Sequence, residues 1–105
     1  MNKYELSSKY NDYKQFERLT KEEQAHLIEW IEKRVKPFET KRYNEHLRSY
    51  QMKHIYEAET GVYLTNGQFK GGMLSAGFEP FDYDSMDWRF KVGDRFVIDS
   101  LRLQQ

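Results

Sequence analysis

The chain has 105 residues, with 17 Lys or Arg and 17 Asp or Glu, so its formal net charge is zero. This length predicts a single domain, and the neutral balance excludes a polybasic protein that binds nucleic acid through bulk charge. Cysteine is absent, which excludes disulfides, thiolate nucleophiles and Cys-based zinc sites and favours a cytoplasmic location. No long apolar run occurs in the sequence, so no membrane span is expected. Aromatic residues make up 16%, which predicts a small core built from a few large rings.

The N-terminal part is expected to contain an arm followed by a helix. Residues 1–18 are polar with scattered rings and no clear period, which indicates an aromatic-containing arm that is either irregular or a short helix packed by its rings. A single domain is expected over residues 19–105. Its first helix begins after Thr20, because Thr20 and Glu23 have the spacing of a capping box. Pro37 predicts that this helix ends just before it.

Two further helices are expected in the middle of the chain. One extends from about residue 49 to residue 60 and is closed by Gly61 in the left-handed C-cap position. The other covers residues 67–76, where Gly71 and Gly72 each cost about 1 kcal/mol relative to Ala. Glycines inside a helix usually have a structural reason, such as the close approach of a neighbouring element.

The C-terminal part predicts a β-hairpin. In residues 88–92, large apolar side chains alternate with Arg89 and Lys91, and residues 95–99 carry an apolar face. Gly93-Asp94 is a candidate two-residue turn. The order helix, helix, short strand, helix, strand, strand predicts an α+β, mainly helical domain. It is typical of a winged helix-turn-helix, in which the hairpin forms the wing.

Four segments between residues 43 and 92 carry a resemblance: SYQMKH at 49–54, GVYLTNGQFKG at 61–71, GFEP at 77–80 and WRF at 88–90. This pattern resembles a family of small proteins carried by phages and conjugative elements of Gram-positive bacteria. The resemblance covers about half of the chain. It implies a mobile element in the bacterial cytoplasm as the context, and it implies no catalytic residues.

Basic residues are concentrated in residues 33–53, which hold seven Lys or Arg and two Glu with Tyr and His between them. Such a run suits a phosphate backbone, although a solvated helix face explains it as well. At the start of the third helix, Asn66, Gln68 and Lys70 occupy positions that contact base edges in helix-turn-helix proteins, although an N-cap alone accounts for Asn66. The predicted nucleic-acid contacts are Lys41, Arg42, Arg48, Lys53, Asn66, Gln68, Lys70, Arg89 and Lys91.

Residues 79–87 form a segment that is both acidic and aromatic. Carboxylates along a loop can take the place of phosphates in a basic groove of another protein, with the rings as anchors. A solvated loop whose rings pack on the core is the simpler interpretation. The candidate partner contacts are Phe81, Asp82, Tyr83, Asp84 and Asp87.

These patterns predict a non-enzymatic, macromolecule-binding protein with nucleic acid as the leading ligand. The alternative is an anti-defence inhibitor or adaptor, such as an anti-CRISPR protein, that binds a host protein such as a Cas nuclease. No catalytic set, cofactor or metal site is expected, because the three histidines lack converging ligands and the serines lack a triad pattern. A homodimer is compatible with a helix-turn-helix. We expect cations and anions on separate sides of the molecule; an acidic loop on the basic face would favour the inhibitor.

Overall fold

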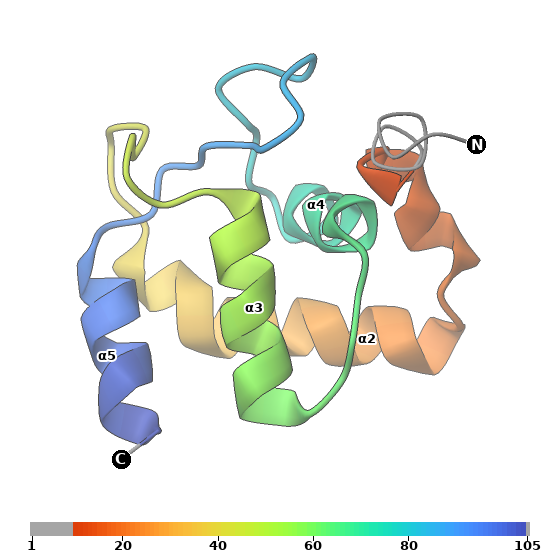
Figure 1. The fold of residues 1–105 in the computed structure, drawn as a ribbon, viewed down its shortest axis with the longest axis horizontal. Coiled ribbons are helices and arrows are strands. Elements are labelled where there is room, and N and C mark those ends of the chain that lie inside the picture. The colour runs from red at the N-terminus through yellow and green to blue at the C-terminus, as the bar shows by residue number, and fades with distance from the viewer. Residues whose placement is uncertain (1–9, 105) are drawn as a thin grey trace.

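The computed structural model describes residues 10–104, and this part of the chain is mainly helical and contains no β-strand. It forms the α-helices α2 (Lys21–Trp30), α3 (Ser49–Thr60), α4 (Asn66–Ser75) and α5 (Arg95–Leu103). The 3₁₀ segments are η1 (Tyr13–Arg18) and η3 (Lys36–Phe38), and η2 (Ile31–Val35) is a π-helical segment. Figure 1 shows α2 running behind α3, with α4 seen nearly end-on. Each helix in this part of the chain is too short or too polar to cross a membrane.

The ends of α2 and α3 are set by the residues that the sequence indicates. Thr20 Oγ1 accepts a hydrogen bond from Glu23 N at 3.1 Å, and Glu23 Oε1 accepts one from Thr20 N at 2.8 Å, which confirms the predicted capping box. The helical path continues from α2 through η2 to Val35 and changes to the 3₁₀ segment η3 at Lys36, one residue before Pro37. Helix α3 ends at Gly61, whose φ of 77° is the expected left-handed C-cap.

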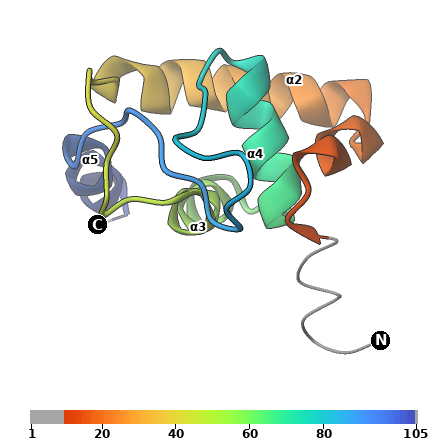
Figure 2. The same ribbon diagram turned by 90° about the horizontal axis from the view of Figure 1, so that it is seen from above.

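Helix α4 lies at the centre of the packed core. Figure 2 shows it crossing from α2 towards α3 beneath the loops. A Cβ added at Gly71 would lie 2.3 Å from the Cβ of Phe16 in η1, and one added at Gly72 would lie 2.3 Å from Cδ2 of Leu27 in α2. The close approach that the two glycines predict is therefore confirmed, because their missing side chains let η1 and α2 pack directly on the α4 backbone.

Large aromatic rings join the α-helices, as the aromatic content predicts. The ring of Trp30, at the end of α2, meets those of Tyr56, Phe69 and Phe96 edge to face. The centroid distances are 5.1, 6.3 and 5.9 Å. The four rings come from α2, α3, α4 and α5, so one cluster connects all four of these helices.

The predicted C-terminal hairpin is wrong. Residues 95–99 lie within α5, where Phe96 and Ser100, about one turn apart, are buried. Residues 88–92 are extended, but their backbone pairs with residues 39–49 through hydrogen bonds and two isolated antiparallel bridges. Apolar residues in α5 recur at helical spacing over more than two turns, and this longer pattern outweighs the short alternation that predicted a strand. The wing is therefore missing from residues 10–104, and a winged helix-turn-helix is not confirmed.

A partly buried polar network fixes α5 to the other helices. The Arg34 guanidinium donates hydrogen bonds to both carboxylate oxygens of Glu59, at 2.8 and 2.9 Å, and to Asp99 at 2.6 Å. Trp30 and Ser100 donate to the same Glu59 carboxylate at 3.1 and 3.0 Å. Burial raises the pKa of Glu59, but these hydrogen bonds outweigh it and leave the pKa below its usual value.

The predicted N-terminal arm is described from residue 10 onwards, and residues 1–9 lie outside the described part of the chain. Asp12 caps η1, because its Oδ1 accepts a hydrogen bond from Lys14 N at 2.9 Å. A Cβ added at Gly67 would lie 2.1 Å from the backbone oxygen of Asp12. The described part of the arm is therefore packed on α4.

Candidate functional site

Two loops that are far apart in the sequence form one face of the molecule, at the top of Figure 1. They are residues 39–48, between η3 and α3, and residues 79–92, between α4 and α5; we call their joint surface the loop face. Backbone hydrogen bonds join the two loops, as between Asn44 N and Phe90 O at 3.0 Å. The basic loop and the acidic loop therefore lie side by side, and the expected separation of cations and anions on two sides is wrong.

Stacked cations and rings connect the two loops. The guanidinium carbon of Arg89 lies 4.1 Å from the ring centroid of Phe81, and the Lys91 ammonium lies 5.0 Å from that of Tyr43. The two rings meet edge to face at 5.3 Å, and Arg89 forms a 3.8 Å ion pair with Glu45. Arg89 and Lys91, predicted as phosphate contacts, thus also hold the loop face together.

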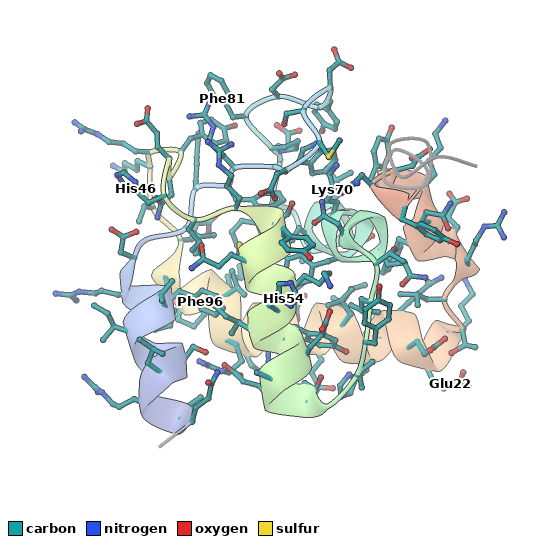
Figure 3. The ribbon with its side chains drawn as sticks, in the orientation of Figure 1. Glu22, His46, His54, Lys70, Phe81 and Phe96 are labelled. Carbon is teal, nitrogen blue, oxygen red and sulfur yellow. The ribbon has the colours of Figure 1, made fainter. Side chains whose placement is uncertain are left out.

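Three other predicted nucleic-acid contacts lie in the first loop. Lys41, Arg42 and Arg48 are exposed, and the loop also exposes His46, which is labelled in Figure 3. Thr40 Oγ1 donates a hydrogen bond to Arg42 O at 2.9 Å, which helps to shape the turn that carries these side chains. This part of the loop face offers positive charge to a partner.

The acidic part of the loop face has a fixed backbone. Phe81 N donates a hydrogen bond to Arg89 O at 3.0 Å. Asp82 organises the turn that follows, because its Oδ1 accepts from Asp84 N and its backbone oxygen accepts from Ser85 Oγ, each at 2.9 Å. Internal bonds therefore hold the segment that presents the aspartates.

Asp87, which the sequence suggests as a partner contact, acts inside the fold. Its Oδ1 accepts hydrogen bonds from Tyr50 N at 2.8 Å and from Ser49 Oγ at 2.9 Å, in the first turn of α3. Ser49 Oγ in turn accepts a hydrogen bond from Trp88 N at 3.0 Å. Asp87 therefore supplies the N-terminal cap that the residue before α3, Arg48, does not provide.

Three large apolar side chains of the acidic loop face solvent. Phe81 is 58% exposed, Tyr83 49% and Met86 46%. Phe81 lies at the outer end of the loop in Figure 3. The simpler interpretation, a solvated loop whose rings pack on the core, holds in part for Tyr83, whose ring meets that of the buried Trp88 at 5.3 Å. Phe81 packs instead on Tyr43 and Arg89 of the loop face.

The side chains predicted to contact bases at the start of α4 are used within the protein. Asn66 is buried, and its amide group donates hydrogen bonds to Asn11 Oδ1 and to Met86 O. Gln68 Oε1 accepts from Thr65 N at 2.9 Å, and Thr65 Oγ1 accepts from Gln68 N at 3.1 Å, which makes a second capping box. The sequence suggested Asn66 as the N-cap of α4, but the N-cap is Thr65. Asn66 is held instead by segments that are distant in the sequence.

Lys70 is buried beneath the acidic loop, in the region labelled in Figure 3. Its ammonium donates hydrogen bonds to Asn11 O and Met86 O, each at 2.8 Å, and to Ser85 O at 3.4 Å, and it lies 4.6 Å from the centroid of Trp88. Burial lowers the pKa of Lys70 to about 8. Lys70 therefore positions the acidic loop from below.

Lys53 completes the set of predicted residues. It is buried in α3, where its ammonium forms an ion pair with Glu57 one turn later. The structure thus divides the predicted residues into two groups. Those on the loop face are Lys41, Arg42, Arg48, Phe81, Asp82, Tyr83, Asp84, Arg89 and Lys91. Those used mainly within the fold are Lys53, Asn66, Gln68, Lys70 and Asp87.

Several residues of the loop face were not among the predicted contacts, among them Tyr43, Glu45 and Met86. Tyr43 is visible in the sequence as a ring within the basic run, but its pairing with Phe81 joins positions 38 residues apart. No local period predicts such a pairing, because it depends on how the two loops meet. The composition of the two loops indicates that these residues are exposed, but it does not show that they lie on the same surface.

The chemistry of the loop face suits recognition of a macromolecule. A broad depression of about 700 Å³, lined by residues 40–46 and 92–94, opens at its edge. Among residues 10–104, no group of three or more His, Asp and Glu side chains is placed to hold a metal ion. Comparisons with models of known protein families, with curated proteins and with solved structures found no match to this chain.

Proposed function

We propose that this protein is a non-catalytic binding module whose loop face docks on a partner protein. The observation that carries this proposal is the exposure of Phe81, Tyr83 and Met86 on a loop whose backbone is held by internal bonds. Several exposed apolar side chains on one loop are typical of an interaction surface. A loop that is already ordered loses little conformational entropy when it binds, so its rings can serve as anchors.

The charges of the loop face favour a protein as the partner. Cations such as Lys41 and Arg42 lie on the same face as Asp82 and Asp84. A nucleic-acid backbone is uniformly negative and would be repelled by the aspartates, whereas a protein surface can match both signs. Aromatic residues, Met and Arg are also the types enriched in protein interfaces.

The resemblance of residues 43–92 to proteins of phages and conjugative elements supports a host protein as the partner. A Cas nuclease or a restriction enzyme has a basic groove for nucleic acid, and Asp82 and Asp84 would take the place of phosphates in it. Phe81 would then act as an apolar anchor beside them. This role is that of an anti-defence inhibitor in the bacterial cytoplasm.

Photo-crosslinking tests the proposal. Benzoylphenylalanine placed at Phe81 is expected to crosslink one host protein in a lysate, whereas the same probe at Ile98 in α5 is not. The captured protein is then purified, and its affinity for the parent chain is compared with that for Phe81→Ala and for Asp82→Asn/Asp84→Asn. We expect each variant to bind at least about tenfold more weakly, as for interface anchors. Equal affinities would contradict docking through the loop face.

A nucleic acid is the second candidate ligand, because Lys41, Arg42 and Arg48 are exposed on one loop. Fluorescence anisotropy with labelled duplex and single-stranded oligonucleotides over a salt series tests it. Under this hypothesis Arg42→Ala/Arg48→Ala weakens binding and reduces the slope of log K against log salt by about 2. No binding at micromolar protein and low salt would exclude this candidate and leave the protein-binding proposal intact.

A further inference from the structure

The charged side chains of the loop face are arranged with opposite signs at its two ends. Residues 39–48 and residues 79–87 stand side by side at the top of Figure 1, and Figure 2 shows the same arrangement from above. The exposed cations of the first loop are Lys41, Arg42 and Arg48, and the exposed aspartates of the second loop are Asp82 and Asp84. Within residues 10–104, none of these side chains forms an ion pair. The loop face is therefore positive at one end and negative at the other.

Charges of both signs lie between these two ends, where the loops meet. Glu45 of the first loop forms the 3.8 Å ion pair with Arg89 of the second. Glu39 and Glu79 line one hollow together with Lys91. Because carboxylates and cations are mixed in this middle part, they leave the polarity between the two ends in place.

An exposed ring also lies between the two ends. Phe81 meets the ring of Tyr43 at 5.3 Å, so it stands where the two loops join, and it is 58% exposed. Figure 3 labels Phe81 at the outer edge of the face and His46 in the first loop beside it. In a symmetric dimer both subunits use the same patch, so the patch must be complementary to itself. An apolar ring between a positive end and a negative end satisfies that requirement.

We propose that the loop face pairs with the loop face of a second copy of this chain, about a twofold axis that crosses the face near Phe81. A half-turn about this axis places the basic end of each copy opposite the acidic end of the other. Lys41 and Arg42 of one copy then lie opposite the aspartates of the other, and this match occurs twice. The two Phe81 rings meet close to the axis. Because the formal net charge is zero, no overall repulsion opposes the pairing.

The size of the loop face predicts a weak dimer. A standard interface uses about 20–30 residues on each side, and the loop face offers fewer, because several of its residues are buried. We therefore expect a micromolar dissociation constant. Pairing would cover Phe81, so a second copy and the host protein would compete for one surface. That competition rests on the proposed function, whereas the pairing itself does not.

Analytical ultracentrifugation of the full chain tests the proposal through a charge exchange. The parent is expected to change from monomer to dimer between about 5 and 500 μM. Lys41→Glu/Arg42→Glu makes both ends of the face acidic, and Asp82→Lys/Asp84→Lys makes both ends basic. Each variant alone should dimerise at least about tenfold more weakly than the parent, because like charges then meet. An equimolar mixture of the two variants should form a heterodimer, because opposite charges meet again at both ends.

Lys21→Glu/Lys33→Glu is the matched control. It changes the net charge as Lys41→Glu/Arg42→Glu does, but in α2 and η2, which lie away from the loop face in Figure 1, and it should dimerise like the parent. Thermal unfolding establishes that each variant is folded. Should the double aspartate variant unfold, Asp84→Lys replaces it, because this change keeps the Asp82 carboxylate that accepts from the backbone N of residue 84.

Three results would overturn the pairing of loop faces. They are a parent that stays monomeric at about 500 μM, a mixture of the two variants that does not associate, and a dimer that persists in both variants but is lost in Leu101→Lys, which would place the interface on α5. A monomeric parent would leave crosslinking of a host protein through Phe81 untouched, so failure of the dimer and failure of the proposed function are separate results.

Discussion

The Lys70 ammonium joins three parts of the chain that are distant in sequence. It donates hydrogen bonds to Asn11 O in the N-terminal segment and to Ser85 O and Met86 O in the acidic loop, and it lies over Trp88. Lysine is rarely buried, because its charge loses hydration. Here three carbonyl oxygens match the three donors of the ammonium and offset part of that loss.

The lowered pKa of Lys70 predicts that stability rises with pH above about 8. The folded protein releases this proton near pH 8, whereas the unfolded chain holds it until the usual value of 10.5. Between these values the unfolded state binds more protons, so the free energy of unfolding rises with pH, by at most about 1.4 kcal/mol per pH unit from this group. Below pH 8 both states hold the proton, and the contribution is constant.

Urea unfolding of the parent and of Lys70→Met at pH 7.5, 8.5 and 9.5 checks this prediction. The variant keeps every other titrating group, so the difference between the two slopes belongs to Lys70. We expect the parent to gain stability relative to the variant as the pH rises. Parallel pH dependences would contradict the assignment.

The packing of α4 against η1 depends on one missing side chain. In an exposed helix, Gly→Ala stabilises by about 1 kcal/mol. At Gly71 the added Cβ would lie 2.3 Å from Phe16 Cβ and 2.5 Å from Tyr13 O, so Gly71→Ala should destabilise the protein by about 1–3 kcal/mol. Ser75→Ala, at the exposed end of the same helix, should change stability by less than about 1 kcal/mol. Urea unfolding measures both; a Gly71→Ala protein as stable as the parent would refute the close contact.

The docking of α5 depends on the Arg34 network. Arg34→Met leaves the partly buried Glu59 carboxylate without its guanidinium partner and should cost about 1.5–3 kcal/mol. Lys33→Met removes the exposed pair between Lys33 and Glu29 and should cost less than about 1 kcal/mol. Denaturant unfolding measures the free energy of unfolding of both variants. Similar losses of stability in Arg34→Met and Lys33→Met would contradict a stabilising role for the Arg34 network.

The same network predicts acid sensitivity. Because the pKa of Glu59 in the folded protein lies below the usual 4.5, its contribution to stability is present above pH 4.5 and is lost as the pH falls through the lower folded value. Arg34→Met should reduce this loss. Free energies of unfolding of the parent and of Arg34→Met, measured between pH 6 and pH 3, check this prediction. The same loss of stability with falling pH in both proteins would contradict the pairing of Arg34 with Glu59.

The helices of the fold could be predicted because their signals are local. The capping box at Thr20, the C-cap at Gly61 and the two adjacent glycines of α4 each act within a few residues. The C-terminal hairpin was predicted wrongly, because a five-residue alternation in residues 88–92 was extended into residues 95–99. Those residues belong instead to an amphipathic helical pattern that continues to Leu103 and is visible in the sequence, and it places Phe96 and Ser100 against α2 and α3.

The candidate site was only partly predictable. Lys41, Arg42 and the acidic loop were found from composition, and they lie on the surface as expected. Composition could not show that Lys70 and Asn66 are buried, because that depends on how residues 10–16 cover α4. It also could not show that the two charged loops meet.

The molecule as a whole combines zero net charge with apolar residues exposed on α5. Ile98, Leu101 and Leu103 face solvent, and the pI is near 6.8. Near that pH no net charge opposes association, so we expect a solubility minimum there. Leu101→Lys should raise solubility at pH 6.8 more than Ser75→Lys, which adds the same charge elsewhere. Precipitation by polyethylene glycol at several pH values measures this, and equal effects of the two variants would contradict a role for α5.

The bond between Lys70 and the Asn11 carbonyl has a practical consequence for labelling. The Lys70 ammonium binds both the Asn11 carbonyl and the Met86 carbonyl, so a displacement of the backbone at residue 11 affects the turn that contains Met86. The C-terminal end of α5 lies away from the loop face in Figure 1, so a fluorophore or affinity handle attached there leaves the Met86 turn undisturbed. A fluorophore attached at Tyr10 would instead lie beside the bond between Lys70 and the Asn11 carbonyl.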